Sequence, residues 1–569
     1  MPIDTRTPAN LGDTVFMAGV WLLGLAYLLP GHFTPWDSFN QQWLAALGGG
    51  LMALAAARCG GTGRPGWPWP TWLAFALATT APLQLAWGQI HYRIDALMPA
   101  LYLAGFGLMV LAGRDLGRRP ESAAGHLDAV FRMFWMAALA STGIAMLQWL
   151  GLMRGGIFVT NLPPAGRPFG NLAQVNHHAT LLVLGLVGLA HEFERRHLGG
   201  KVATLAAGWL VFGLAMAQTR TSWLALAVLA VCWLECRRRV DLRISVGVAV
   251  GLALALLLGT LAFEPASRLL LLAEPPNLAA RLEAGPRSEM WLGMARAVWM
   301  SPWTGWGWNQ VAVAHAAVAT DHAAGHRLIQ SAHSLLLDLP LAVGLPLALC
   351  VFALAAAWLR KRIRTCSSSN QWALIAAVLA IGVHALVEYP LEYSYFLIPF
   401  GLCAGLLEGL QDTPGGPKVP CTLKTMALAG VLAMTTWVGF EYMAIEAQSR
   451  TVRLSLLGVG SAKEAYADLL RSPLLDAQSD ELRFMMTPAR PGMTTSQVDE
   501  MRTISQRFPS PPAMLRFALA AGLNGRPDEA ALTLRRLCHM HLPDRCAEAR
   551  MAWLGAQAQH TELAGIPAP

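Results

Sequence analysis

A row of polar side chains begins one of the apolar segments of this chain. In RPFGNLAQVNHHATLL, residues 167–182, Gln174, Asn176 and His177 stand directly before a run of Leu, Val and Gly. Polar groups at the edge of an apolar segment are costly unless a partner or a ligand satisfies them. The stretch is therefore a candidate ligand site, although its residues alone do not identify the ligand.

Arg220 indicates what kind of ligand to expect. It lies in AMAQTRTSWLAL, with apolar segments on both sides. A guanidinium so close to hydrocarbon is by default a functional-site hypothesis, the alternative being a side chain that snorkels to the headgroups. An anionic partner would satisfy it, and the planar guanidinium suits phosphate because it can bind two oxygens at once.

A histidine and an acid supply groups that could move or hold a proton. His333 begins the segment SAHSLLLDLPLAVGLP, and a neutral imidazole can act as a base near pH 7, although a lone histidine there can also be only a polar tip. Glu388 and Tyr389 join two later apolar segments in HALVEYPLEY. Glu388 could pair with an arginine or be a helix-end charge, and the aromatic residues around it are typical of an interfacial belt.

The sequence offers no pattern for a metal or for acyl transfer. Three further histidines precede His333 without metal-type spacing, and no cysteine has zinc-site spacing. GWGWNQ, residues 305–310, lacks the lysine and the preceding strand of a phosphate-binding loop, so we reject that interpretation. Arginines, amides and a histidine together suit a phosphate leaving group without a metal or another cofactor.

Composition indicates the elements that must position these residues. The chain has 569 residues, of which 54% are hydrophobic and only 14% charged, which is typical of an integral membrane protein. A spanning helix needs about 20 mostly apolar residues, and in hydrocarbon the helix satisfies every backbone group. We therefore predict an all-α membrane protein with about thirteen spans. Their approximate cores are residues 15–29, 43–57, 72–87, 97–112, 131–150, 178–190, 203–217, 223–234, 244–261, 335–358, 372–387, 395–407 and 426–440.

Charge predicts the orientation of these spans. Clusters of Arg and Lys occupy alternate connections, and they account for much of the net charge of +8, which gives no reason to expect nucleic-acid binding. Because such clusters stay on the cytoplasmic side, the N-terminus is expected in the cytoplasm and the C-terminus outside. The candidate residues then all lie at the outer face.

The predicted organisation has four parts. Residues 1–262 hold nine spans, residues 263–332 a large outer loop with short helices such as 287–300, and residues 333–443 four more spans. Residues 444–569 form a polar helical tail, in which residues 514–537 are typical of a helix, an Asn-Gly turn and a helix, like one tetratricopeptide-type hairpin. Cys538 and Cys546 lie in this tail and could pair in an oxidising compartment.

Five ordered blocks of the chain resemble the bacterial protein O-oligosaccharyltransferases of the O-antigen ligase and polymerase superfamily. The family usually has Asn after the helix-start histidine and often Pro before the Asn-His pair, where this chain has Ser334 and Val175. The first departure could alter how His333 is oriented. The blocks are RPFGNLAQVNHHATLL, QTRTSWLAL, RSEMWLGMARAVWMSPWTGWGWNQ, SAHSLLLDLPLAVGLP and VHALVEYPLEYSYFLIPFGLCAGLLEG.

The resemblance implies a GT-C-like, metal-independent glycosyltransferase of the inner membrane with a periplasmic active site and tail. It would pass an oligosaccharide from undecaprenyl pyrophosphate to Ser or Thr of a periplasmic protein such as a pilin, with inversion at the anomeric carbon. Arg220 and Arg287 would hold the pyrophosphate. His333 would activate the acceptor hydroxyl or bond to the departing phosphate. The resemblance also leaves His178 as a bystander. The residues expected to bind or position substrates are Arg167, Gln174, Asn176, His177, Arg281, Glu388 and Tyr389.

Three alternatives remain at the level of sequence. Within the superfamily, the enzyme could ligate O-antigen to lipid A core or polymerise O-antigen repeats, although the long tail favours a protein acceptor. A secondary transporter is disfavoured because no internal repeat is evident. A membrane-anchored scaffold is disfavoured because thirteen spans with adjacent arginines exceed what an anchor needs.

Overall fold

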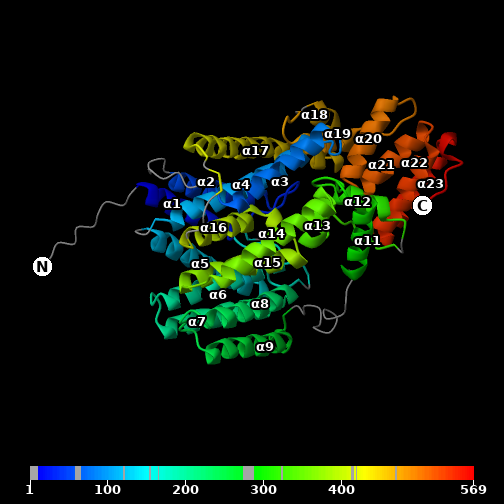
Figure 1. Cartoon of the computed structure of the whole chain (residues 1–569). Helices are drawn as coiled ribbons and strands as arrows, with labels where there is room; N and C mark the ends of the chain where they lie inside the picture. The colour runs from blue at the N-terminus through cyan, green and yellow to red at the C-terminus, as the bar shows by residue number, and fades with distance from the viewer. Residues whose placement is uncertain are drawn as a thin grey trace. The chain divides into compact units, whose positions relative to one another are not determined.

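The computed structural model describes the chain except residues 1–10, 58–65, 120–121, 153–155, 165, 273–286, 322–323, 412–415, 418, 468 and 470. Within the described residues the secondary structure is helical, with no β-strand (Figure 1). Six of these helices are long and apolar enough to cross a membrane. The predicted all-helical class is therefore confirmed, whereas the number of thirteen spans stays a prediction.

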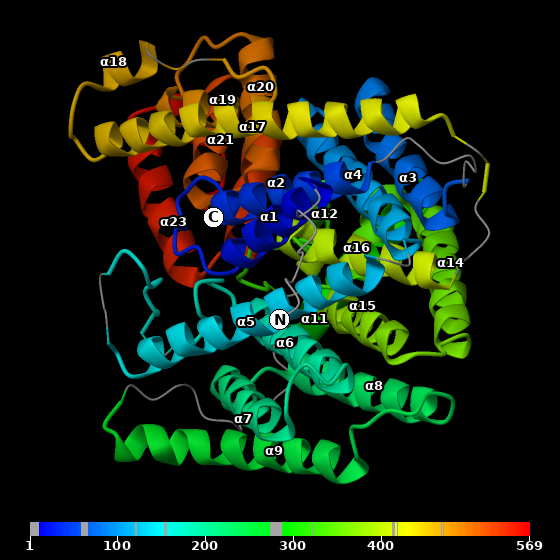
Figure 2. The same cartoon turned by 90° about the vertical axis from the view of Figure 1, so that its left-hand side faces the viewer.

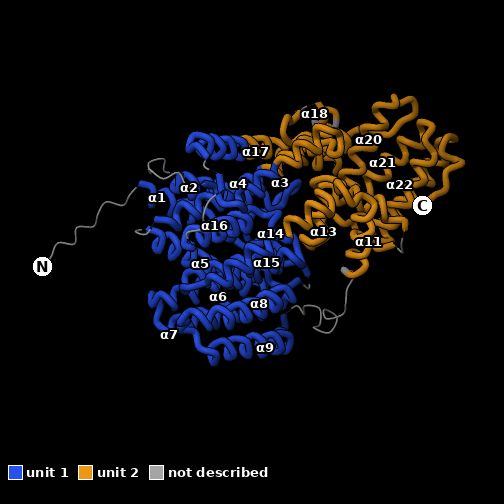
Figure 3. Tube along the Cα trace, in the orientation of Figure 1, with its two compact units in different colours: residues 1–78, 101–282, 353–436 blue, residues 79–100, 283–352, 437–569 orange. Residues whose placement is uncertain are grey.

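The chain divides into two compact units (Figure 3). The first comprises residues 1–78, 101–282 and 353–436, and the second residues 79–100, 283–352 and 437–569. Four long helices have residues in both units: α3 (Trp69–Ala86), α4 (Arg93–Gly117), α14 (Leu345–Arg364) and α17 (Cys421–Leu456).

The first unit is a bundle of apolar helices built around α6 and α15. Helix α6 packs against α5, α7, α8 and α15, and α15 also packs against α8 and α16. In the most apolar stretch of α15, 72% of the residues are buried, compared with 17% in that of α9. Helix α9 therefore lies at the edge of the bundle, beside α7 (Figure 2). The helices wholly in this unit are α1 (Leu11–Ala26), α2 (Phe39–Ala56), α5 (Ala123–Trp149), α6 (Val175–Glu194), α7 (Gly200–Ala217), α8 (Arg220–Arg237), α9 (Val246–Leu269), α15 (Ser369–Val387), η1 (Pro390–Glu392) and α16 (Ser394–Leu410).

The second unit combines the large loop, the α3–α4 connection and the tail. Asp476 at the start of α19 accepts hydrogen bonds from the backbone N–H groups of Arg93 and Ile94, at 2.8 and 3.2 Å. Helix α12 packs against α20 and α13. The helices wholly in this unit are α11 (Arg287–Met300), α12 (Val311–Val318), α13 (Leu335–Val343), α18 (Ala462–Ala467), α19 (Asp476–Met486), α20 (Thr495–Arg507), α21 (Pro511–Leu523), α22 (Pro527–Met540), α23 (Pro543–Gln557) and η2 (Thr561–Leu563).

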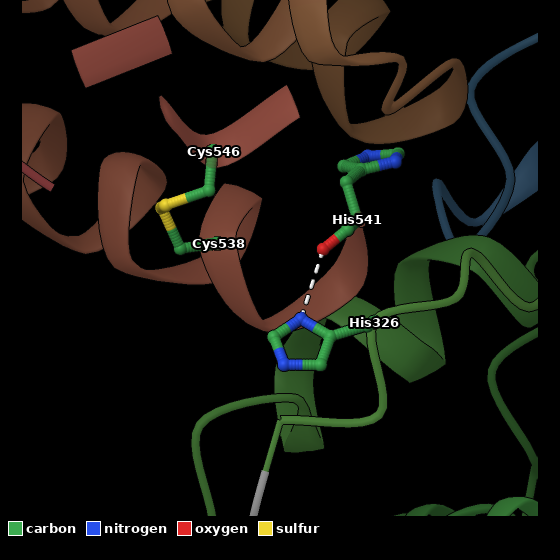
Figure 4. The surroundings of a disulfide bond; sticks show 4 residues. All are labelled: His326, Cys538, His541 and Cys546. Carbon is green, nitrogen blue, oxygen red and sulfur yellow. Dashed lines mark hydrogen bonds between the residues drawn. A yellow bond between two sulfur atoms is a disulfide. The ribbon is translucent and has the colours of Figure 1, made fainter. Parts of the chain in front are cut away.

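Local predictions in the second unit are confirmed. Helix α11 covers residues 287–300, and the predicted hairpin is formed by α21 and α22, joined at Asn524 and Gly525, whose φ is +78°. Cys538 and Cys546 form a disulfide. Beside it, the imidazole Nδ1 of His326 hydrogen-bonds the carbonyl of His541 at 3.0 Å (Figure 4). The tail also contains helices beyond the single hairpin that the sequence indicated.

Two predicted spans differ in the structure. Residues 335–358 do not form one helix, because α13 ends at Val343 and α14 begins at Leu345. Pro340 removes a backbone donor inside α13, and Gly344 adopts a φ of +83°, which continues no right-handed helix. The last predicted span, 426–440, lies inside the 36-residue helix α17, which reaches into the region assigned to the tail.

Candidate functional site

The polar stretch before α6 first builds the helix start itself. Gln174 has an extended backbone and its side-chain oxygen accepts the backbone N–H of His177 at 2.8 Å. This contact satisfies one of the free donors at a helix N-terminus. Gln174 therefore has a structural role as a cap, in addition to its expected role towards the substrate.

The loop leading to this cap is fixed by two residues that the sequence analysis did not select. Gln148 of α5 accepts the N–H groups of Phe169 and Gly170, each at 3.0 Å, and donates to the carbonyls of Thr160 and Gly170. The buried Asn171 donates to the carbonyls of Leu28 and Phe158. A glutamine inside the apolar run AMLQWL was the available signal for this anchor.

The start of α6 meets the end of α15. The amide of Asn176 donates to the carboxylate of Glu388 at 2.7 Å, across 212 residues of sequence. One turn further along, the hydroxyl of Thr180 hydrogen-bonds Nδ1 of His384 at 2.8 Å, so the two helices run antiparallel here. Glu388 is only 2% exposed and forms the C-cap of α15. The structure thus joins two predicted site residues from opposite parts of the sequence.

His177 lies inside a group of aromatic rings. Its Nδ1 is 2.9 Å from the hydroxyl of Tyr395 in a hydrogen bond, and its ring centroid lies 4.4 Å from that of Tyr393 and 6.4 Å from that of Tyr389. The imidazole is 1% exposed, and its Nε2 has no hydrogen-bond partner among the described residues. The adjacent His178 bonds to Ser141 at 2.9 Å, which agrees with its interpretation as a bystander to the ligand.

The turn between α7 and α8 presents Arg220. Gln218 ends α7 in the left-handed conformation, and Thr219 caps α8 by accepting the N–H of Ser222. Arg220 follows as the first residue of α8; its side chain is exposed, and the structure gives it no hydrogen bond or ion pair to a described residue. Arg167 differs, because it donates to the carbonyls of Ala217 and Gln218 at 3.2 and 2.9 Å and thereby supports this turn.

His333 lies in the second unit, on the loop that begins α13. Its backbone has a φ of +51°, its side chain is half-buried, and its N–H donates to the hydroxyl of Ser331 at 3.1 Å. Helix α11 is tied to this loop, because the indole N–H of Trp291 donates to the carbonyl of Ala332 at 2.9 Å. Arg287 is the first residue of α11, one turn before Trp291, so the Arg-x-x-x-Trp spacing connects its helix to the His333 loop.

The structure therefore brings the predicted residues together in two groups. Asn176, His177, Glu388 and Tyr389 are neighbours in the first unit, and Arg167 supports the turn of Arg220 there. His333 and the start of α11 are neighbours in the second. Arg281 and the side chain of Arg287 lie outside the described residues. Among the residues that are described, no group of three His, Cys, Asp or Glu side chains is arranged to hold a metal ion.

The GWGWNQ segment has a structural role. The N–H of Trp306 donates to the carbonyl of Leu341 in α13 at 2.6 Å, and the N–H of Leu345 donates to the carbonyl of Pro302 at 2.7 Å. A Cβ on Gly305 would lie 2.5 Å from the Leu341 oxygen, so only glycine permits this approach. The segment packs against the break between α13 and α14.

Comparison with known proteins gives matches across these same elements. Three family models match: "Protein glycosylation ligase" over residues 168–190, "O-Antigen ligase" over 205–353, and "Virulence factor membrane-bound polymerase, C-terminal" over 372–554. The chain is 25% identical over 539 residues to the "General O-oligosaccharyltransferase" of Acinetobacter baylyi, covering 92% of each chain. It is also 25% identical over 408 residues to the "ComP-specific O-oligosaccharyltransferase" of that organism, covering 70% of this chain and 72% of the relative.

Proposed function

We propose that this chain glycosylates proteins at Ser or Thr. The premise is that it is a glycosyltransferase homologous to the bacterial O-oligosaccharyltransferases and carries the O-antigen ligase domain. The donor is an oligosaccharide on undecaprenyl pyrophosphate, and the acceptor is a periplasmic protein such as a pilin. The reaction needs no metal. The enzyme is a multi-pass protein of the inner membrane, with its N-terminus in the cytoplasm and its active site and tail in the periplasm.

The observation that carries this proposal is where the family matches fall. The glycosylation-ligase match, residues 168–190, covers the loop and helix start that hold Asn176 and His177. The O-antigen ligase match, residues 205–353, contains Arg220, Arg287 and His333. These two matches thus contain most of the residues for which the sequence predicts chemistry; Glu388 and Tyr389 lie in the polymerase match, and Arg167 directly precedes the first match. The relative that covers 92% of the chain is an O-oligosaccharyltransferase.

The arginines handle the leaving group in this mechanism. The exposed guanidinium of Arg220 stands at the N-terminus of α8, where free backbone N–H groups and the helix dipole also favour an anion. Arg287 is the first residue of α11. Positive charge aimed at the pyrophosphate stabilises the negative charge that develops as it departs, and such electrostatic stabilisation is usually a large contribution to catalysis.

His333 acts at the acceptor or at the leaving phosphate. The acceptor oxygen bonds to the anomeric carbon of the sugar, and the bond from that carbon to the pyrophosphate breaks with inversion. Both electrons of the broken bond leave with the lipid pyrophosphate. As general base, the imidazole takes the proton of the acceptor hydroxyl. In the other role, it donates a hydrogen bond to the departing phosphate, and the proton of the acceptor hydroxyl passes to water.

The group around α6 and α15 binds and positions the substrates. Asn176 and Glu388, joined at 2.7 Å, offer an amide and a carboxylate of the kind that bind sugar hydroxyls. His177 and Tyr389 add an imidazole and a phenol in an aromatic environment. Arg167, Gln174 and Arg281 complete the proposed set, the first two also holding the surrounding backbone.

The direct test is reconstitution. The purified protein, a lipid-linked oligosaccharide and a pilin are mixed, and the mass of the pilin is measured. The wild type is expected to add the mass of the glycan, and His333→Ala, with its membrane insertion verified, is expected to lose this activity. Transfer by His333→Ala at a rate near that of the wild type would contradict the assignment of His333.

A second candidate function is O-antigen ligation or polymerisation, which the polymerase match over residues 372–554 favours. A deletion strain separates the two functions. Loss of glycans from periplasmic proteins supports the protein transferase, whereas loss of the lipopolysaccharide ladder supports the second candidate.

A further inference from the structure

The backbone at His333 adopts a conformation that requires support. Its φ of +51° is in the left-handed region, which residues other than glycine rarely adopt because of steric strain. Such a conformation persists when the surrounding structure fixes it, and it is frequent at functional sites. Helix α13 is only nine residues long and is too short to be stable in isolation. Contacts elsewhere must therefore hold both the loop and the helix.

Asp338 provides the support at the start of the helix. Its Oδ1 accepts the N–H of Ala332 at 2.7 Å, and its Oδ2 accepts the N–H of Ser334 at 3.3 Å. The same Oδ2 accepts the hydroxyl of Ser331 at 3.0 Å, while the oxygen of that hydroxyl accepts the N–H of His333. All three backbone N–H groups from 332 to 334 are thereby tied to one carboxylate, directly or through Ser331.

This arrangement replaces an ordinary helix cap. Ser334 occupies the N-cap position but its side chain makes no capping hydrogen bond to the helix. The carboxylate of Asp338 instead reaches back from the first turn of α13 to the loop. At the other end, the backbone N–H groups of Trp306 and Gly307 donate to the carbonyl of Leu341, near the end of α13. Hydrogen bonds therefore hold the helix and its preceding loop at both ends.

We infer that Asp338 is a positioning residue for the transfer reaction: it holds loop 331–334 in the conformation that presents the His333 imidazole, and it does not itself bind substrate. The inference rests on the proposed function, in which His333 takes part in transfer.

The informative substitution is Asp338→Asn. The volume barely changes, but one carboxylate oxygen becomes an NH2 group, which faces a backbone N–H or the Ser331 hydroxyl instead of accepting from it. The loop then shifts relative to the reacting atoms. A misplacement of about 1 Å can cost about 100-fold in rate, so we expect kcat to fall between about 10- and 100-fold. The KM values for both substrates are expected to stay within about twofold, because Asp338 does not bind them.

The experiment uses the full-length protein purified in detergent, an undecaprenyl-pyrophosphate-linked oligosaccharide and a pilin acceptor. It measures kcat, both KM values and the thermal unfolding midpoint for the wild type, Asp338→Asn and His333→Ala. Asp544→Asn is the matched control, because this exposed carboxylate of the tail contacts only Arg545 among the described ion pairs. The control is expected to keep wild-type kinetics.

The outcomes separate the inference from the proposed function. Wild-type activity of His333→Ala would remove the proposed role of His333. An inactive His333→Ala together with an unchanged kcat for Asp338→Asn would overturn only the positioning role. A fall in kcat that matches a loss of folded protein, or a large rise in KM, would overturn it too.

A second variant decides the matter if Asp338→Asn does not fold. Ser331→Ala keeps both backbone hydrogen bonds to Asp338 and removes only the hydroxyl that links Asp338 to the N–H of His333. Its kcat is expected to fall between about 3- and 10-fold, since one neutral hydrogen bond is worth about 1 kcal/mol. An unchanged kcat for Ser331→Ala would then contradict the positioning role.

Discussion

The ion pair between Asp95 and Arg507 offers a quantitative test of how the tail is attached. Arg507, the last residue of α20, donates from Nε and Nη2 to the two carboxylate oxygens of Asp95, both at 2.7 Å. Asp95 is 1% exposed and also accepts the amide of Gln310 at 3.2 Å. The bidentate contact joins the tail to the first turn of α4, and Gln310 joins the same carboxylate to the large loop.

The size of the effect follows from burial. Removing one partner of a buried pair leaves an uncompensated charge and typically costs about 3–5 kcal/mol, whereas replacing both partners by neutral groups costs much less. In Arg507→Leu, the carboxylate of Asp95 keeps only the amide of Gln310 as a side-chain hydrogen-bond donor among the described residues. We therefore expect the tail of Arg507→Leu to lose about 3 kcal/mol of local stability, and the double variant Asp95→Asn/Arg507→Leu to recover at least about 1 kcal/mol of that loss.

Hydrogen exchange of the backbone amides in α19, α20 and α21 measures this local stability in the full-length protein. If the intrinsic exchange rates of the amides do not change, a loss of about 3 kcal/mol in the free energy of local opening makes these amides exchange about 150-fold faster. The surface variant Arg545→Leu, whose ion pair with Glu548 is exposed, serves as control and should change exchange in the tail by less than about twofold. Exchange in Arg507→Leu no faster than in this control, or a double variant less stable than either single variant, would refute the reasoning.

Three further predictions follow from the described contacts. Burial raises the pKa of Glu481 from 4.5 to about 7, and Arg507 opposes this rise. Because the pKa of the folded state lies above that of the unfolded state, the tail should lose about 3 kcal/mol of stability as pH rises from about 4.5 to 8. Glu481→Gln, assayed by thermal unfolding against pH, should abolish this slope, and an unchanged slope would contradict the assignment. Arg220→Lys should lower kcat/KM for the lipid-linked donor about 10- to 100-fold and leave the unfolding midpoint unchanged. The exposed side chain keeps its charge but loses the guanidinium that can bind two phosphate oxygens at once. Unaltered donor kinetics would argue against phosphate binding. Cys538→Ser opens a disulfide between residues eight apart and should destabilise the α22–α23 connection by about 2 kcal/mol. The backbone amide of His326 donates to the carbonyl of His539 at this connection, so its hydrogen exchange should become faster. Unchanged protection of that amide would show that the disulfide does not support this contact.

Several features follow from the sequence because they depend on near neighbours along the chain. The apolar segments predicted helices, and helices occur in each of the predicted spans, although the tenth is divided between α13 and α14. An Asn-Gly pair between amphipathic segments predicted the hairpin of α21 and α22, and the 287–300 pattern predicted α11. The residue types of the candidate site were equally accessible, because Arg, His and amides beside hydrocarbon are informative wherever the chain folds.

The partners of the polar groups were decided only by the tertiary structure. Nothing near Asn176 in the sequence indicates that its amide meets Glu388, 212 residues away. Likewise, Arg167 was expected at the substrate, but its described hydrogen bonds go to the carbonyls that end α7. A polar side chain can be satisfied by any donor or acceptor that folding brings near, so its type predicts a need for a partner but not which partner it finds.

The same distinction explains the His333 loop. The sequence identified the histidine from its type and its place at a helix start, and it gave no reason to select Asp338, which is one acid among apolar residues. Only the folded backbone shows that this carboxylate binds the N–H groups of Ala332 and Ser334 and supports a left-handed residue between them. The chemical type of each side chain is thus known from the sequence. The orientation of that side chain depends on long-range contacts and on backbone conformation, which exist only in the folded protein.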